Sequence, residues 1–177
     1  QIWDKINNGV FVVAELGKNF IQTEEERPVE EYLENAKKLV RAAKDAGADA
    51  VKFQTHNVDD EQLNIKIVAP HFSGERYAWV TRNQKATPID KFWKPLKEYC
   101  DKIGIVFFST PMSKGAAKIL DKVGVSLWKI GSSDILDFPM LDHMRRSRKP
   151  IIISSGMSTV PELDKAINFI KEKNNKI

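Results

Sequence analysis

Five short runs rich in Val, Ile or Phe recur along the chain, and each is followed by a segment whose apolar positions recur with the period of an α-helix. This alternation is typical of βαβ units and a parallel sheet. The runs are apolar almost without interruption, which favours strands that are covered on both faces. The predicted strands are 10–16, 50–54, 105–110, 126–131 and 150–154.

The segments between these runs carry the start and stop signals of helices. Pro28 suits the first turn of a helix, Thr159 is suited to capping one, and glycines such as Gly104 stand where helices should end. Pro95 lies inside a helical pattern and predicts either a new helix start or a kink. The predicted helices are 29–46, 88–103, 114–123, a shorter one after Pro139, and 161–173.

One connection breaks this rhythm, because residues 56–87 show no clear period. Its length of roughly 30 residues far exceeds an ordinary loop between a strand and a helix. A loop of this kind, which here carries Tyr77 and Trp79, folds over a site as a lid in some enzymes. An insertion that packs on the rim of the fold explains the same length equally well.

Polar residues stand where the predicted strands reach their carboxyl ends. In parallel α/β folds the ligand site lies at this end of the sheet. The sequence therefore predicts one site built from several strand ends. The candidate residues are Glu15, Lys52, Gln54, Thr110, Lys129, Ser132, Asp134, Ser154 and Gly156.

Two lysines carry most of this prediction. A lysine at one strand end is usually a solvated charge, but Lys52 lies between Val and Phe, and Lys129 lies between Trp and Ile. Side chains alternate along a strand, so Lys52 and Gln54 share a face. If that face lines the site, two ammonium groups converge near hydroxyl groups, which suits a small molecule bearing phosphate and carboxylate.

Composition limits the other classes of function. The 177 residues are 42% hydrophobic and 29% charged, as expected of one globular domain or a piece of one. The 28 basic and 24 acidic residues are interspersed, and no basic stripe or nucleic-acid motif is present. The single cysteine, Cys100, predicts a buried thiol and a reducing compartment. No segment approaches the ~20 apolar residues of a membrane span and residues 1–8 lack a signal-peptide layout, so we expect a cytoplasmic protein.

Five stretches, residues 14–19, 46–55, 108–111, 129–132 and 149–157, contain most of the candidate site residues. Together they resemble the sialic acid synthase family, which includes N-acetylneuraminate synthase and its legionaminate and pseudaminate relatives. Each stretch alone is a weak signal, but they run in family order and cover nearly the whole chain outside the long loop. Two departures lie near the predicted site: Asp134 stands where many members have Glu, and Phe20 where many have His.

The resemblance implies that C3 of phosphoenolpyruvate attacks the aldehyde carbon of an open-chain N-acetylated amino sugar, such as N-acetylmannosamine. Water then adds at C2, and phosphate leaves by C–O cleavage to give a nonulosonic acid. Gln54 and Asp134 would contact the sugar, and Glu15 would either activate water or hold a lysine. By the same resemblance, phosphoenolpyruvate would be held by Lys52, Thr110, Lys129, Ser132, Ser154 and the backbone amide of Gly156.

The resemblance also implies a TIM-type (β/α) barrel, of which the chain would supply about five of eight βα units as the amino-terminal portion of one catalytic domain, residues 1–177. Such a barrel needs eight strands and ~250 residues. The family is homodimeric, has a carboxyl-terminal antifreeze-like domain without a counterpart here, and uses a divalent metal, Mn²⁺ or Mg²⁺, as a Lewis acid. Its metal-binding histidines lie on later strands, so no metal ligand is expected within this chain, and we expect the polypeptide alone to lack full activity.

Two alternatives stay open. Another phosphoenolpyruvate-condensing barrel would bind a sugar phosphate and should show additional arginines at the strand ends, which here carry none. A noncatalytic sugar-binding or assembly module derived from a synthase would have tolerated the loss of either lysine, and both are present. His56 follows the second predicted strand and could contact a substrate, but the favoured interpretation is a histidine of the solvated rim.

Overall fold

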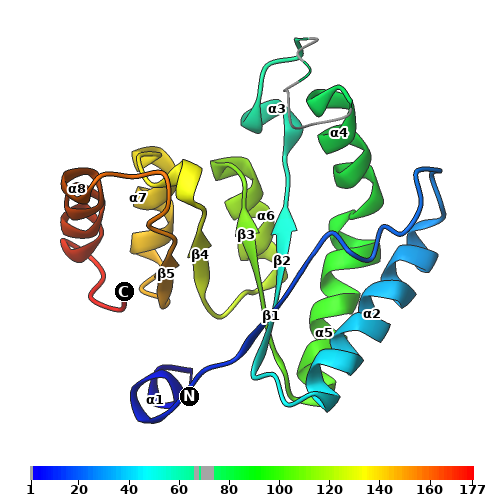
Figure 1. The fold of residues 1–177 in the computed structure, drawn as a ribbon, viewed down its shortest axis with the longest axis horizontal. Coiled ribbons are helices and arrows are strands. Elements are labelled where there is room, and N and C mark those ends of the chain that lie inside the picture. Colours follow the sequence, from blue (N-terminus) through cyan, green and yellow to red (C-terminus); the bar gives the residue numbers. More distant parts are fainter. Residues whose placement is uncertain (1, 66–67, 69–73) are drawn as a thin grey trace.

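The computed structural model describes residues 2–65, 68 and 74–177 and shows an α/β fold with parallel strands. Strands β1, β2 and β3 form one parallel sheet in that order, β4 pairs with β5 in parallel, and β4 lies next to β3. Figure 1 shows the chain winding from strand to helix throughout. The elements are α1 (Ile2–Asn8), β1 (Val13–Gly17), α2 (Val29–Asp45), β2 (Ala50–Thr55), α3 (Val58–Glu61), α4 (Arg76–Ala86), η1 (Ile89–Trp93), α5 (Lys94–Ile103), β3 (Val106–Pro111), α6 (Lys114–Val123), β4 (Trp128–Ile130), η2 (Ser132–Asp134), α7 (Phe138–Arg146), β5 (Ile151–Ile153) and α8 (Val160–Lys171).

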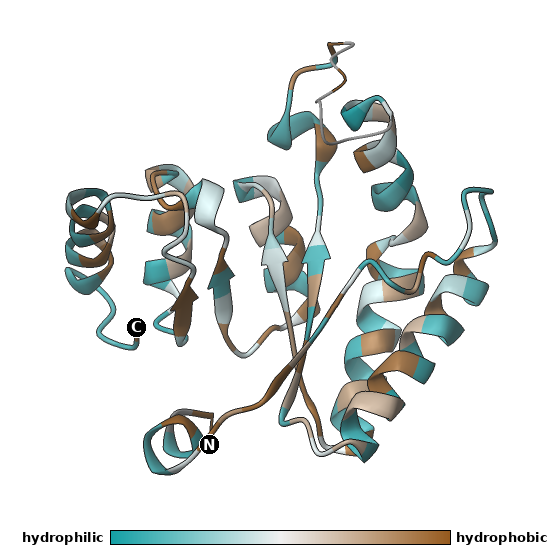
Figure 2. Cartoon of the chain, viewed as in Figure 1, coloured by the Kyte–Doolittle hydropathy of each residue, from teal (hydrophilic) through white to brown (hydrophobic). Residues whose placement is uncertain are grey.

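The central strands β2 and β3 are covered on both faces, as their apolar sequence predicts, whereas β1 and β5 are less buried. One face packs against the helices and carries an aromatic cluster in which the ring of Phe53 lies 5.7 Å from that of Phe107 and 6.0 Å from that of Trp93. The opposite face holds a second buried cluster of Ala50, Phe108 and Leu127. Figure 2 shows β5 as uniformly hydrophobic, whereas the carboxyl end of β2 is hydrophilic. On this face of β2, a buried apolar residue near the amino end is therefore followed by polar side chains toward the carboxyl end.

Helix boundaries follow the local signals in the sequence. Thr159 caps α8 in a reciprocal arrangement with Glu162, and Gly104 ends α5 in the left-handed conformation that glycine tolerates best. Pro95 lies in the first turn of α5, directly after the π-helical turn η1, so the predicted helix 88–103 is two elements. Cys100 is buried, as predicted, and burial raises the pKa of its thiol to about 12.

The long connection 56–87 is more ordered than its sequence indicates, because it contains α3 and α4. Within α4 the buried face includes the polar Asn83 beside Val80 and Ala86, so no apolar stripe marks the helix. The Tyr77 hydroxyl donates to Asp59 at 3.2 Å and links the two helices. Residues 66–67 and 69–73 of the predicted loop lie outside the described residues.

The connection is also attached to the body of the fold. The carboxylate of Asp60 accepts a hydrogen bond from the backbone amide of Gly115 at the start of α6. The side-chain oxygen of Gln84 accepts from the amide of Val58 at 2.6 Å. These contacts place α3 at the carboxyl ends of the strands, packed on α6 and α4.

Candidate active site

Lys52 lies on the strand face that continues the cluster of Ala50 and Phe108. In the parallel register Lys52 is opposite Glu15 on β1 and Phe108 on β3, with Thr110 one step further toward the carboxyl end. The Lys52 ammonium forms an ion pair with the Glu15 carboxylate and donates to the Thr110 hydroxyl at 3.2 Å. Only 12% of the Lys52 side chain is exposed, so its charge is held against the sheet and not in bulk solvent.

Lys129 reaches the same space from β4. Its ammonium donates to the carbonyl of Ile130 at 2.6 Å and to the hydroxyl of Ser154, which follows β5. Burial lowers the pKa of Lys129, and the positive charge of Lys52 lowers it further. The two ammonium groups therefore act on each other across one space. Lys129 forms no ion pair with any carboxylate of residues 2–65, 68 and 74–177.

The turn after β4 brings two further predicted residues, Ser132 and Asp134, to this space, and Gly156 reaches it from the segment after β5. Position 156 lies against the side chain of Ser132, because a Cβ added to Gly156 would meet the Ser132 Cβ at 3.7 Å. The Asp134 carboxylate folds over Gly131, where an added Cβ would lie 2.5 Å from Oδ2, so a larger residue at 131 would displace it. The Oδ2 atom of Asp134 is buried without a hydrogen-bond partner in the described chain.

The charges around Asp134 connect these residues electrostatically. Burial is the main cause that raises the pKa of the Asp134 carboxyl, and the negative charge of Glu61 contributes to the rise. The positive charge of Lys129 acts in the opposite direction. The charges of both Lys129 and Glu61 therefore act on the Asp134 carboxyl. A bound hydroxyl group would supply the donor that Oδ2 lacks.

All nine predicted site residues are thus found at the carboxyl ends of the strands. Glu15, Lys52 and Thr110 are joined directly, Lys129 and Ser154 form a second joined pair, and Gln54 is half-buried on the same face of β2 as Lys52. We refer to Lys52, Thr110, Lys129, Ser132, Ser154 and Gly156 as the anion cradle.

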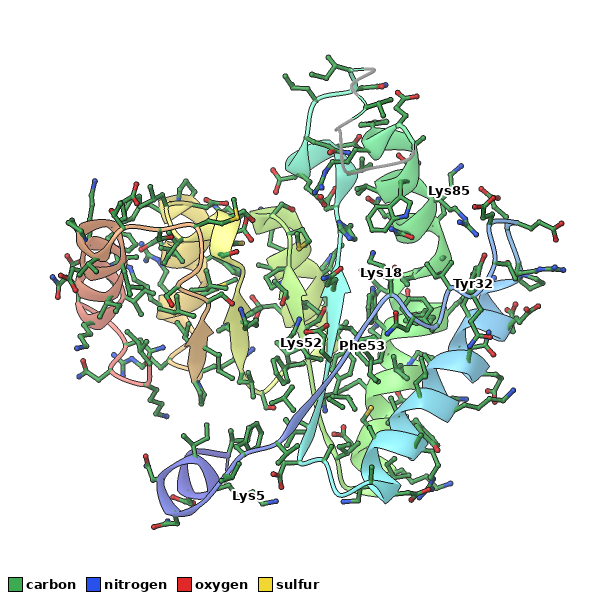
Figure 3. All side chains as sticks on the ribbon, in the orientation of Figure 1. Lys5, Lys18, Tyr32, Lys52, Phe53 and Lys85 are labelled. Atoms are coloured by element: carbon green, nitrogen blue, oxygen red, sulfur yellow. The ribbon has the colours of Figure 1, made fainter. Side chains whose placement is uncertain are left out.

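A second group of side chains lies above the cradle, and the sequence did not single it out. His56 is only 4% exposed, so it is not part of a solvated rim, and its Nδ1 lies 2.5 Å from a Glu61 carboxylate oxygen. The Trp79 ring packs edge to face with His56, and the Lys18 ammonium lies 5.5 Å from the centre of the Trp79 ring. Figure 3 shows Lys18 and Lys52 in one region near β2, far from Lys5 beside α1.

The divalent metal implied by the resemblance does not fit the described residues. In the ranges 2–65, 68 and 74–177, no three His, Cys, Asp or Glu side chains lie together as a metal would require. His56 and Asp134 each have a buried polar atom without a hydrogen-bond partner in the described residues, but neither side chain belongs to a group of three potential metal ligands there. No metal-dependent chemical step is therefore assigned to the described residues.

The parallel strands and their connecting helices define a TIM-barrel-like α/β protein with polar side chains at the strand ends. Structures of this class are similar to it, including the truncated 3-deoxy-D-arabino-heptulosonate 7-phosphate synthase from Thermotoga maritima, at a TM-score of 0.64 and 15% identity over 96% of this chain and 50% of that one. At that identity the likeness shows the fold alone.

The chain belongs to the NeuB family, whose model matches residues 39–177. It is 33% identical to the pseudaminic acid synthase of Helicobacter pylori over 93% of this chain and 46% of that protein. It is 28% identical to the human N-acetylneuraminate-9-phosphate synthase over 93% of this chain and 44% of that protein. The chain thus spans about half the length of the curated relatives it matches.

A solved structure supports the same assignment. The N-acetylneuraminic acid synthetase of Leptospira borgpetersenii, in complex with citrate, superposes with a TM-score of 0.77 at 29% identity, over 94% of this chain and 52% of that one. The resemblance to the sialic acid synthase family is therefore confirmed, and the match covers the amino-terminal part of longer proteins. None of the helices in the described residues combines the length and apolar character needed to cross a bilayer.

Proposed function

We propose that the protein containing this chain condenses phosphoenolpyruvate with an N-acetylated amino sugar and releases a nonulosonic acid and phosphate. The observation that carries the proposal is the pair of lysines in the anion cradle, Lys52 and Lys129, which come from different strands, and the charge of Lys52 lowers the pKa of Lys129. Lys52 forms an ion pair with Glu15, whereas Lys129 donates to a carbonyl and a hydroxyl and forms no ion pair within residues 2–65, 68 and 74–177. An anion placed between the lysines would offset their repulsion.

Phosphoenolpyruvate suits this arrangement because it carries a phosphate and a carboxylate on one small carbon frame. Lys129 and Lys52 would bind the two anionic groups through charge-assisted hydrogen bonds, with Ser132 and Ser154 donating hydroxyl hydrogens. The backbone amide of Gly156 would add a donor that needs no side chain. Holding the enol in this way would present C3 to the sugar aldehyde in a fixed orientation, which lowers the entropic cost of the encounter.

The sugar would lie on the opposite side of the enol, against Gln54 and Asp134. The unpartnered Oδ2 of Asp134 would accept a hydrogen bond from a sugar hydroxyl. The ion pair of Glu15 with Lys52 supports the second of its two expected roles, that of holding a lysine in place. In that role Glu15 keeps the Lys52 ammonium directed into the cradle while about half of its own side chain faces solvent. The family resemblance supports a homodimer and completion of the barrel by strands outside this chain.

Product analysis tests the proposed function. The protein in its full natural length is incubated with phosphoenolpyruvate, Mn²⁺ and N-acetylmannosamine or a related N-acetylated amino sugar, and released phosphate and the nine-carbon keto acid are followed by mass spectrometry. We expect equal amounts of the two products. Phosphoenolpyruvate labelled with ¹⁸O in the bridging C–O position should yield phosphate that carries the label, because C–O cleavage leaves the bridging oxygen on phosphorus. Release of phosphate without any condensed acid would contradict the proposal.

A further inference from the structure

His56 extends the row of side chains that leads out of the anion cradle. Side chains alternate along a strand, so positions 52, 54 and 56 share one face of β2 and its extension. The pairing with β3 continues to the end of β2, where the amide of Met112 donates to the carbonyl of Thr55 at 3.0 Å. His56 is therefore the next side chain beyond Gln54 on the face that carries Lys52, and it is 96% buried, at 4% exposure.

The imidazole of His56 is held in one orientation by its neighbours. Its Nδ1 lies 2.5 Å from the carboxylate of Glu61, which makes Nδ1 the protonated nitrogen of the neutral ring. Burial lowers the pKa of His56, although the hydrogen bond to Glu61 opposes the change, so the ring is neutral near pH 7. Its Nε2 then carries a lone pair, is buried, and has no hydrogen-bond partner in the described part of the chain.

Trp79 packs against the ring of His56, and Lys18 packs against the ring of Trp79. Lys18 follows the last residue of β1, and its ammonium lies 5.5 Å from the centre of the Trp79 ring. Burial lowers the pKa of Lys18 to about 7, and Glu61 acts in the opposite direction. Lys18 and His56 thus contact the same indole ring, and the charge of Lys18 contributes to the lowered pKa of His56.

The chemistry of these groups selects a hydroxyl-bearing ligand. A hydroxyl can donate to the lone pair of His56 Nε2 and accept from the Lys18 amine at the same time. A phosphate oxygen would meet the lone pair of Nε2 with its own negative charge and leave the histidine unsatisfied. Aromatic rings also pack against the C–H groups of sugars, and the Trp79 ring contacts both His56 and Lys18.

We propose that Lys18, His56 and Trp79 form a second subsite, above the anion cradle, that binds the hydroxyl-bearing tail of the open-chain amino sugar. The inference rests on the proposed function and assigns to this subsite the choice among sugars that differ in their distal hydroxyls. Glu61 is a positioning residue that fixes which nitrogen of His56 accepts. The charge of Glu61 acts on both Lys18 and Asp134, which supports a location of this second subsite near the anion cradle.

The test is a comparison of His56→Leu with the wild type in the full-length protein, using N-acetylmannosamine and its monodeoxy analogues at C4, C5 and C6. In the wild type, removal of the hydroxyl that His56 binds should lower kcat/KM by at least about tenfold, equivalent to about 1.4 kcal/mol. In His56→Leu that analogue and the parent sugar should be used equally well. The KM for phosphoenolpyruvate should stay within about twofold in both proteins.

Two further variants complete the design. Lys18→Met, which keeps the length of the side chain but removes the donor, should lose discrimination against the same analogue and stands in if His56→Leu does not fold. His143→Leu is the matched control, because His143 contacts Asp121 through Nε2 at 2.6 Å on α7, and it should discriminate like the wild type. Unchanged discrimination in folded His56→Leu or Lys18→Met would overturn the subsite. Failure of the wild type to bind phosphoenolpyruvate would instead contradict the proposed function.

Discussion

Replacement of Lys129 by Met should lower the turnover of the full-length protein by about 10³-fold, because it removes a half-buried ammonium that makes no direct ion pair in the described residues and is left to bind an anion. Methionine preserves most of the length and the apolar stem, so β4 and its packing against β5 should be retained. The measurement is kcat/KM from phosphate release at saturating sugar, together with the circular dichroism spectrum and thermal midpoint of the variant.

Lys97→Met is the matched control for this result. Lys97 forms an ion pair with Asp101 at 2.6 Å on the surface of α5, away from the strand ends. Its replacement should change turnover by less than about twofold, because an exposed pair of this kind contributes little even to stability. Turnover of Lys129→Met within tenfold of the wild type, in a folded protein, would remove Lys129 from the site.

Replacement of Phe53 by Ala should lower the free energy of unfolding by about 3–5 kcal/mol. Phe53 is fully buried between the sheet and the helices, with ring centres of Phe20, Trp93 and Phe107 within 6.1 Å of its own. Its removal leaves a cavity that the surrounding aromatic rings fill only in part. Denaturant unfolding followed by tryptophan fluorescence measures the change.

The control for the core is Val10→Ala, since Val10 is 85% exposed and its replacement should cost no more than about 0.5 kcal/mol. Phe53 lies between Lys52 and Gln54 on β2, so the same substitution should also weaken binding in the cradle through loss of strand position. A destabilisation of Phe53→Ala below about 1 kcal/mol would show that the aromatic cluster does not hold β2 against the helices.

The strand and helix pattern was predictable because each strand carries a dense apolar run and most helices carry an apolar stripe. The helix predicted at 114–123 has those bounds in α6, and the cap predicted at Thr159 is present. The first strand begins at Val13 and not at residue 10, because Val10 and Val12 are exposed and lie outside the ladder with β2. Hydrophobic composition alone does not distinguish an exposed valine before a strand from a buried one within it.

The anion cradle was predictable for a related reason, since strand alternation relates Lys52 to Gln54 and the parallel sheet brings the strand ends together. The proposed second subsite of Lys18, His56 and Trp79 was not predictable from the sequence. Its members His56 and Trp79 meet only through the folding of α3 and α4, whose buried face includes the polar Asn83 and therefore lacks a periodic apolar signal. Lys18 carries no sequence signal of its own, and its contact with the Trp79 ring depends on the folding of α4.

The most direct measurement is an isothermal titration of phosphoenolpyruvate into the full-length wild type, Lys52→Met, Lys129→Met and Lys97→Met. We expect one binding site per chain in the wild type and in Lys97→Met. In Lys52→Met and in Lys129→Met the affinity for phosphoenolpyruvate should fall by at least about a hundredfold, equivalent to about 2.7 kcal/mol. Wild-type affinity in either Lys52→Met or Lys129→Met would contradict the claim that both lysines bind one anion.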